Sequence, residues 1–405
     1  MLIAIAFVGC GSAPIDFGPS SDADGDTDTD ADSDTDTDAD TDTEPEAPPL
    51  ETFNQASKRY ASLFDPSVLH AVTITFTEAN WKVLQETGAE LPASVAIDGE
   101  VLPLAGVELA GDQAGFGWDG KVDLRLDFDQ YFDGLTYGGM EHLVFDDQAA
   151  DPTGVREVIA NRVLIAAGVS TPRAGFATVQ VQGGVPLLYT LREEVDVAFL
   201  QRWWAPTGPL WEAEDGADFT VAGLPGWTGG TVAEDALLES ARVAIQTSGA
   251  DFEAQVGAVL DLEQARAVWA WQAVLGNSDG WPYELDDVWL YGDPGQANRF
   301  VFLPHRVDEG FDPLATWDAV APEVAVRCRF DAACDALLRT TILAAADEYE
   351  AVGVGTWAQE AFDLTEAAML ADPAPPIPPA QMLAERALLL PIVETRPTAV
   401  RDAVN

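Results

Sequence analysis

Asp151-Pro-Thr-Gly-Val-Arg-Glu-Val-Ile-Ala-Asn-Arg-Val-Leu-Ile-Ala-Ala-Gly168 is the stretch from which the fold class follows most directly. Aspartate is a favoured N-cap residue, and proline is favoured at the first position of a helix. Apolar residues then recur at helical spacing until Gly168, and glycine commonly ends a helix. The stretch therefore predicts one helix, and the segments on both sides of it have a different periodicity.

Short segments around this helix alternate apolar and polar residues, which is the pattern of half-buried β-strands. They are residues 72–76, 93–97, 101–109, 122–128, 178–181 and 187–191. Asp98-Gly99 and Gly183-Gly184 each join two of these segments, and such dipeptides favour tight hairpin turns. The first half of the folded region is thus predicted to be rich in β-structure.

The second half of the chain has mainly helical periodicity. Helices are expected at residues 233–246, 251–260, 262–275 and 380–390, with a further helix to Val404 and strands at 288–291 and 300–303. A β-rich part followed by a helical part predicts an α+β fold in two lobes.

The chain is strongly acidic, with a formal net charge of -49 from 69 acidic and 20 basic residues. This balance argues against a nucleic-acid partner, because binding to phosphates needs clusters of lysine and arginine. An acidic surface instead favours cationic partners or divalent metals.

The first 57 residues have the composition of an export and anchoring segment. Residues 1–9 form a short apolar run before Cys10, which resembles a lipoprotein signal peptide although no lysine or arginine precedes the run. A buried N-terminal strand is the alternative. Residues 10–57 then contain the expected lipidated Cys10 and an Asp/Thr-rich stretch with prolines, predicted to be a disordered tether. The folded domain is expected at residues 58–405 of an exported protein, membrane-anchored by its lipid alone, in the periplasm or at the cell surface.

Two further cysteines, Cys328 and Cys334, are six residues apart. In an oxidising compartment they would pair and close a small structural loop. Two reduced cysteines in the core are the alternative, and the spacing fits no zinc site.

Seven segments, taken in order, carry a resemblance to a known family. They are Gly106-Val-Glu-Leu-Ala-Gly111, Lys121-Val-Asp-Leu-Arg-Leu-Asp-Phe128, Asp151-Pro-Thr-Gly-Val-Arg-Glu157, Gly168-Val-Ser-Thr-Pro-Arg173, Leu188-Tyr-Thr-Leu-Arg-Glu193, Gly276-Asn-Ser-Asp-Gly280 with Asp287-Val-Trp-Leu-Tyr291, and Phe302-Leu-Pro-His-Arg-Val-Asp308. Together they resemble the motifs of the CotH (spore coat protein H) family of atypical secreted protein kinases.

The resemblance implies a divergent two-lobed protein-kinase-like fold, with a β-rich N-lobe and a helical C-lobe. It implies binding of ATP with Mg²⁺ or Mn²⁺, and transfer of the γ-phosphate to Ser or Thr of exported or surface proteins. Phosphoryl transfer needs cations on the phosphates, carboxylates on the metal and an acceptor that orients the incoming hydroxyl. The matching positions give Asp279 the catalytic role, and Asp308 and Asp287 the role of metal ligands.

Three more residues are assigned to the cofactor by the same resemblance: Lys121, Glu193 and Arg156. Lys121 would contact the nucleotide phosphates, and Glu193 would orient Lys121 or contact the nucleotide. Each assignment has a structural alternative. Lys121 would otherwise be a solubilising lysine at a strand edge, and Arg156 would pair with Asp151 or Asp147.

The chain departs from the family motifs at several positions, among them Leu187 in place of Gly and Asp287 in place of Asn. Glu108 and Ala110 stand where the family has Arg and Lys, and His305 and Arg306 stand where it has Trp and Asp. These changes remove positive charge from the phosphate side and one carboxylate from the metal side. A degenerate pseudokinase that acts as a surface adhesin or recognition protein is therefore the second hypothesis.

Overall fold

The computed structural model describes residues 62–405 except 112–117, 119, 205, 206, 215, 225 and 231–233. The expected signal peptide, Cys10 and the tether of residues 10–57 lie outside the described residues. The contacts divide the chain into residues 1–46, which lie outside the described part, and residues 47–405. No described helix is both long and apolar enough to cross a membrane.

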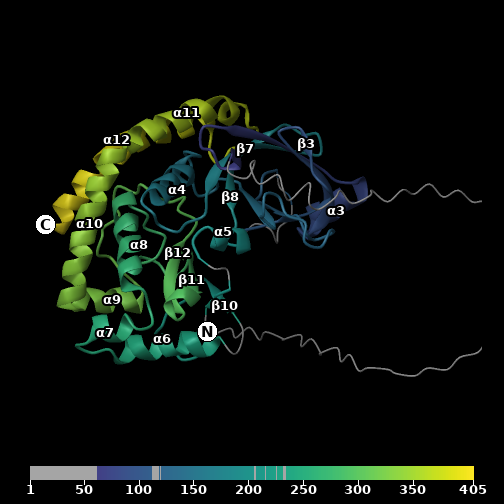
Figure 1. The fold of residues 1–405 in the computed structure, drawn as a ribbon. Coiled ribbons are helices and arrows are strands. Elements are labelled where there is room, and N and C mark those ends of the chain that lie inside the picture. Colours follow the sequence, from purple (N-terminus) through teal and green to yellow (C-terminus); the bar gives the residue numbers. More distant parts are fainter. Residues whose placement is uncertain are drawn as a thin grey trace, which may run out of the picture. The chain divides into compact units, whose positions relative to one another are not determined.

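An eight-stranded sheet forms the N-terminal part, in the order β1-β7-β8-β6-β5-β4-β2-β3 (Figure 1). Its strands are β1 (Leu69–Thr75), β2 (Leu91–Ile97), β3 (Glu100–Val101), β4 (Ala105–Leu109), β5 (Leu124–Asp127), β6 (His142–Asp146), β7 (Ala174–Val181) and β8 (Leu187–Glu193). Helix α3 (Glu78–Thr87) follows β1, and helix α4 (Arg156–Ala166) lies between β6 and β7 in the chain. The expected hairpins at Asp98-Gly99 and Gly183-Gly184 are both present.

The C-terminal part is mainly helical around a small four-stranded sheet of order β10-β9-β11-β12. The strands are β9 (Leu210–Ala213), β10 (Trp227–Gly229), β11 (Val288–Asp293) and β12 (Arg299–Pro304). The helices are α5 (Val197–Gln201), α6 (Asp235–Thr247), α7 (Phe252–Val256), α8 (Leu262–Leu275), α9 (Glu323–Phe330), α10 (Ala332–Val352), α11 (Val354–Ala371) and α12 (Pro379–Val404), with a short 3₁₀ turn at Pro294–Gln296. The chain is thus an α+β protein with a β-rich N-terminal part and a helical C-terminal part, as the periodicity predicted.

Helix α4 begins four residues later than Asp151-Pro152 predicts. Asp151 is therefore not the N-cap of a helix that begins at Pro152. Its Oδ1 accepts hydrogen bonds from Thr153 N and Oγ1, and its Oδ2 accepts one from Arg156 N at 2.6 Å. Asp151 therefore holds a turn that leads into the helix, which starts at Arg156.

Helices α11 and α12 form a band that extends from the C-terminal part to the region of β7 and α4 (Figure 1). Arg386 of α12 donates to the carbonyl of Thr153 and to Oγ1 of Thr365, each at 2.8 Å. Further along α12, Arg396 donates to the carbonyls of Ala273 and Val274 at the end of α8. The last helix thus hydrogen bonds to both parts of the chain.

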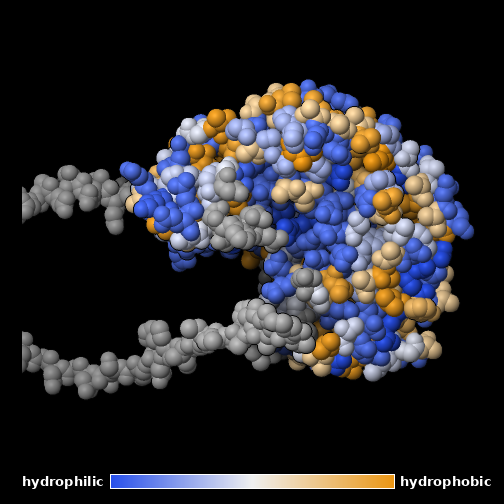
Figure 2. All heavy atoms as spheres, turned by 180° about the vertical axis from the view of Figure 1, so that it is seen from behind, coloured by the Kyte–Doolittle hydropathy of each residue, from blue (hydrophilic) through white to orange (hydrophobic). Residues whose placement is uncertain are grey.

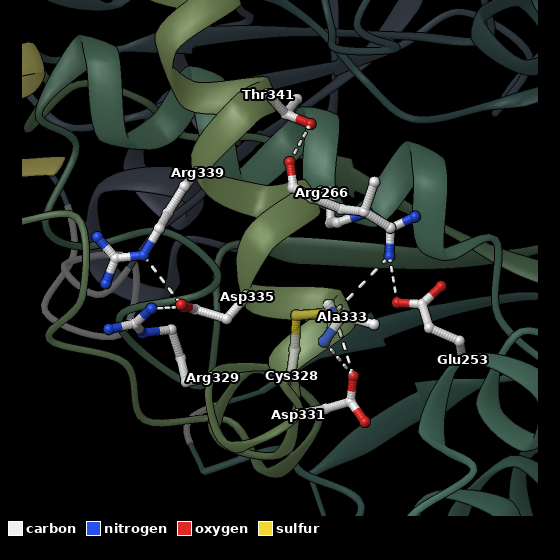
Figure 3. Close-up of a disulfide and its surroundings, with 11 residues drawn as sticks. Glu253, Arg266, Cys328, Arg329, Asp331, Ala333, Asp335, Arg339 and Thr341 are labelled. Atoms are coloured by element: carbon white, nitrogen blue, oxygen red, sulfur yellow. Dashed lines mark hydrogen bonds and ion pairs between the residues drawn. A yellow bond between two sulfur atoms is a disulfide. The ribbon is translucent and has the colours of Figure 1, made fainter. Parts of the chain in front are cut away.

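Cys328 and Cys334 form a disulfide at the junction of α9 and α10 (Figure 3), one of the two arrangements left open by the sequence. Asp331, inside the closed loop, caps α10 by accepting from Ala333 N and Cys334 N. Arg266 of α8 contacts Cys334 Sγ at 3.6 Å and Glu253 Oε1 at 2.7 Å (Figure 3). The disulfide therefore lies against α8, the helix that precedes the Asp279 loop.

Candidate functional site

Two adjoining cavities, of about 210 and 170 Å³, lie between the N-terminal sheet and the loop that follows β12. Both are lined by Ala110, Gly111, Asp123 and Arg306, so they are two parts of one cleft. Figure 2 shows mainly hydrophilic residues around the hollow beside the N-terminal sheet. The smaller cavity is also lined by Asp146, Asp147 and Asp308.

A buried arginine holds two carboxylates on the inner wall of the cleft. Nη1 of Arg192, on β8, lies 3.5 Å from Oδ2 of Asp146 and 3.4 Å from Oε1 of Glu157. Glu157 is in the first turn of α4 and is only 1% exposed. These two carboxylates raise the pKa of Arg192 although its burial opposes this, so the guanidinium keeps its charge.

Asp123, Asp146, Asp147, Glu157 and Asp308 bring more negative charge to this wall than Arg192 offsets. Burial, and then the charge of Asp146, raise the pKa of both Asp123 and Asp308 to about 7. Burial also raises the pKa of Glu157 to about 8. A carboxylate cluster with raised pKa values will hold either protons or a bound cation at neutral pH.

A second carboxylate group follows α8. Oxygens of Asp279, Asp286 and Asp287 lie within 4.8 Å of one another. Gly276 ends α8 in the left-handed conformation (φ 67°), where a Cβ would lie 2.8 Å from Cζ of Arg396. The turn at Gly276 therefore lets the chain leave the helix toward Asp279. Burial raises the pKa of Asp287 to about 8, opposed by Arg306 and reinforced by Asp279 and Asp286.

Arg306 stands between the two carboxylate groups. Its Nε lies 3.8 Å from Oδ1 of Asp287, and its charge also acts on Asp308 and Asp146. Asp287 and Arg306 both have left-handed backbone, with φ of 49° and 52°, which is uncommon outside glycine. His305 beside it is held neutral, because burial and then the charge of Arg192 lower its pKa well below the usual range.

Lys121 does not line the cleft. Its Nζ pairs with Oδ2 of Asp372 at 3.2 Å, where both side chains are buried, and lies 5.2 Å from the ring centre of Tyr189. Desolvation lowers the pKa of Lys121, and Asp372 opposes this. The structure pairs Lys121 with Asp372 and not with Glu193 or Asp308, and the buried side chain is not the solubilising lysine at a strand edge that the sequence offered as the alternative.

Glu193 and Arg156 each have partners of their own. Glu193 is 1% exposed and pairs with Arg173 and Arg202, although it also lines the larger cavity. Arg156 lies 3.7 Å from Asp151, the first of the two partners that the sequence offered it. Among the predicted residues, Glu193 and Asp308 thus line the cleft, and Asp279 and Asp287 lie beside it next to Arg306.

Sequence reasoning missed Asp123, Asp146, Arg192 and Glu157. Arg192 carried a readable signal, because this charged residue directly follows the mainly apolar segment Leu187–Leu191. Asp146 is the last residue of β6, and Asp147 follows it directly. That these side chains meet depends on the pairing of β6 with β8 and on the packing of α4, which no local pattern shows.

The chain was compared with known proteins. No curated protein matches it. A crystal structure of the Helicobacter pylori proinflammatory kinase CtkA is similar at 11% identity and a TM-score of 0.32, over 67% of this chain and 91% of that one. The sequence model described as CotH kinase protein matches residues 120–321. This range contains Asp123, Arg192 and all three carboxylates after α8. Residues 120–321, which contain the carboxylates and the arginines of the cleft, are therefore similar to the CotH kinase family.

Proposed function

We propose that the cleft binds a nucleoside triphosphate together with a divalent cation, and that the chain is a kinase-like phosphotransferase. The observation that carries the proposal is the convergence of carboxylates and two arginines from separate elements on one cleft within the family-matching region. We also propose that the two parts of the chain correspond to the two lobes of a protein kinase.

The larger cavity offers groups for each portion of a nucleotide. Val144, Val195 and Trp289 give it apolar walls suited to a base, and Arg192 and Arg306 supply positive charge suited to phosphates. Arg192 takes the position at the phosphates that the resemblance gave to Lys121. It pairs with Glu157 of α4, a cation-carboxylate pair between strand and helix of the kind found in protein kinases.

Asp287 and Asp308 would hold the divalent cation, because hard cations prefer carboxylate oxygens. When bound, such a cation neutralises charge on the transferring phosphate. Asp279, on the more exposed loop after α8, would orient the hydroxyl of the acceptor. The proposed acceptor is Ser or Thr of an exported or surface protein, and Cys10 would carry the lipid that anchors the chain.

One observation favours a second function. Arg306 stands in the metal motif in place of an aspartate and pairs with Asp287, so a cation already occupies part of the metal side. A pseudokinase that keeps the cleft for recognition at the cell surface is therefore the second candidate.

Calorimetric titration of the full-length chain with ATP tests the proposal. We expect binding with Mg²⁺ or Mn²⁺, and loss of that binding in Asp308→Asn, which keeps the shape of the side chain and removes its charge. Asp279→Asn should bind ATP normally but fail to transfer labelled phosphate to Ser/Thr peptides.

Asp402→Asn, on the exposed surface of α12, is the matched control and should behave as the parent. An absence of ATP binding with either metal would overturn the kinase proposal. Recognition at the cell surface would then be the remaining candidate function.

A further inference from the structure

We propose that Asp123, Asp146 and Asp147 form a divalent-cation site of their own on the N-terminal side of the cleft. This site is separate from the Asp279–Asp286–Asp287 group, and it shares its cavity with Asp308, one of the metal ligands of the proposed kinase reaction. It does not depend on the chain being a kinase.

The three side chains have suitable chemistry and spacing. One carboxylate oxygen of each lies within 4.8 Å of the others. Ligand oxygens on opposite sides of a Ca²⁺ ion lie at about twice the metal–oxygen distance of 2.3–2.6 Å, so the group can close around a cation of that size. Asp123 precedes β5, whereas Asp146 ends β6 and Asp147 follows it, so neighbouring strands fix the three positions.

Glu157 supplies an independent indication of a ligand. It is 1% exposed, and its Oε1 shares Nη1 of Arg192 with Asp146, so its carboxylate lies close to the Asp146 side chain. Its Oε2 is buried without a hydrogen-bond partner among the described residues. A buried carboxylate oxygen without a partner carries a large desolvation cost, and a neighbouring cation would remove that cost.

The charges around the site also favour a bound cation. Arg192 approaches Asp146 and Glu157 only at 3.5 and 3.4 Å, and Arg306, which lines the same cavity, pairs with Asp287 of the other group at 3.8 Å. Further positive charge near Asp123 and Asp146 would therefore stabilise this wall, and a divalent ion provides it.

Sensitised terbium luminescence offers a selective measurement, with Tb³⁺ as a probe for divalent ions. Trp289 lines the cleft and can sensitise a bound lanthanide, whereas residues 11–50 contain neither tryptophan nor tyrosine. The N-terminal segment therefore contains no sensitiser of its own, and the loss of emission in the aspartate variants identifies the site that binds. Competition with Ca²⁺, Mn²⁺ and Mg²⁺ then ranks the natural ions.

Asp123→Asn and Asp147→Asn should each weaken Tb³⁺ binding at least ten-fold, and Asp287→Asn less than three-fold. The Asp123→Asn variant can keep the 2.7 Å bond that Asp123 Oδ1 accepts from Asp147 N, so the change tests charge. Melting curves in EDTA at pH 5.5 identify any variant that is unfolded. Equal affinity in the parent chain and in a folded Asp123→Asn variant would overturn the proposal, as would a loss confined to Asp287→Asn. Loss of Tb³⁺ binding without any effect on ATP binding would support this site whatever the outcome for the kinase proposal.

Discussion

Nζ of Lys121 lies 3.2 Å from Oδ2 of Asp372, a residue 251 positions later in the chain. Oδ2 of Asp372 also accepts a hydrogen bond from Leu188 N on β8. The pair therefore fastens the segment after α11 to the N-terminal sheet. It also gives Lys121 a buried partner within the chain.

Lys121→Met should destabilise the fold and leave ATP binding per folded molecule unchanged. Removing one member of a buried ion pair leaves the other charge uncompensated, which costs about 3–5 kcal/mol. Urea denaturation measures the change, and Lys82→Met, whose side chain is 75% exposed, should stay within about 0.5 kcal/mol of the parent. A stable Lys121→Met chain that no longer binds ATP would contradict the structural role.

Thermal stability without metal should fall as the pH rises from 5.5 to 8.5. Burial raises the pKa of Asp123 and Asp308 to about 7, and that of Glu157 and Asp287 to about 8, above the values of the unfolded chain. Their contribution to stability is thus complete at pH below the unfolded values and is lost as the pH rises through 7 to 8.

The expected fall in melting temperature in EDTA is on the order of 5 °C. Mn²⁺ or Mg²⁺ should restore it at pH 8.5 and have little effect at pH 5.5, where protons occupy the carboxylates. Scanning calorimetry at both pH values, with and without metal, checks this. Equal stabilisation by metal at both pH values would contradict the assignment of these carboxylates as groups that hold protons at low pH and metal at high pH.

Arg306→Asp should raise the affinity of the cleft for Mn²⁺ by at least ten-fold. The change removes the cation beside Asp287 and adds a carboxylate, and aspartate tolerates the left-handed backbone at this position better than arginine does. Arg306→Lys, which keeps the charge, should stay close to the parent in the same calorimetric titration. An unchanged affinity in Arg306→Asp would show that Arg306 does not compete with metal.

Replacing both Cys328 and Cys334 by alanine should cost about 2 kcal/mol, the loop-closure entropy of so short a loop. Urea denaturation of the variant, and of the parent with and without reductant, checks this. The reduced parent should match the variant, and a midpoint independent of reductant would count against any stabilisation by this disulfide.

Local patterns predicted the elements of this fold better than their contacts. The strand pair Val288–Asp293 and Arg299–Pro304, the helix Leu262–Leu275 and the two hairpins follow from periodicity and turn chemistry. The expected strand at residues 101–109 is instead two strands, because the chain breaks at Pro103 before β4 begins at Ala105. Pro391 and Pro397 divide the sequence pattern near the end of the chain, yet α12 continues through both.

The sequence predicted part of the candidate site, because some of its residues lie where local patterns are informative. Asp279, Asp287 and Asp308 occupy positions where helices and strands end, and a local pattern marks such positions. Arg192 and Glu157 form a pair across 35 residues, so only the tertiary structure that brings α4 close to β8 reveals it. Their roles in catalysis or metal binding, and the export and lipid anchor, stay predictions.

The band made by α11 and α12 has a consequence for how this protein can be divided. The family-matching region ends at residue 321, yet Lys121, the carbonyl of Thr153 and the end of α8 within it all bond to residues after 371. A fragment cut at the limits of sequence similarity would lose these partners and leave a buried lysine without its counter-charge. The smallest piece that can be cloned, inherited or swapped as a working module is therefore larger than the piece that is recognisable by sequence.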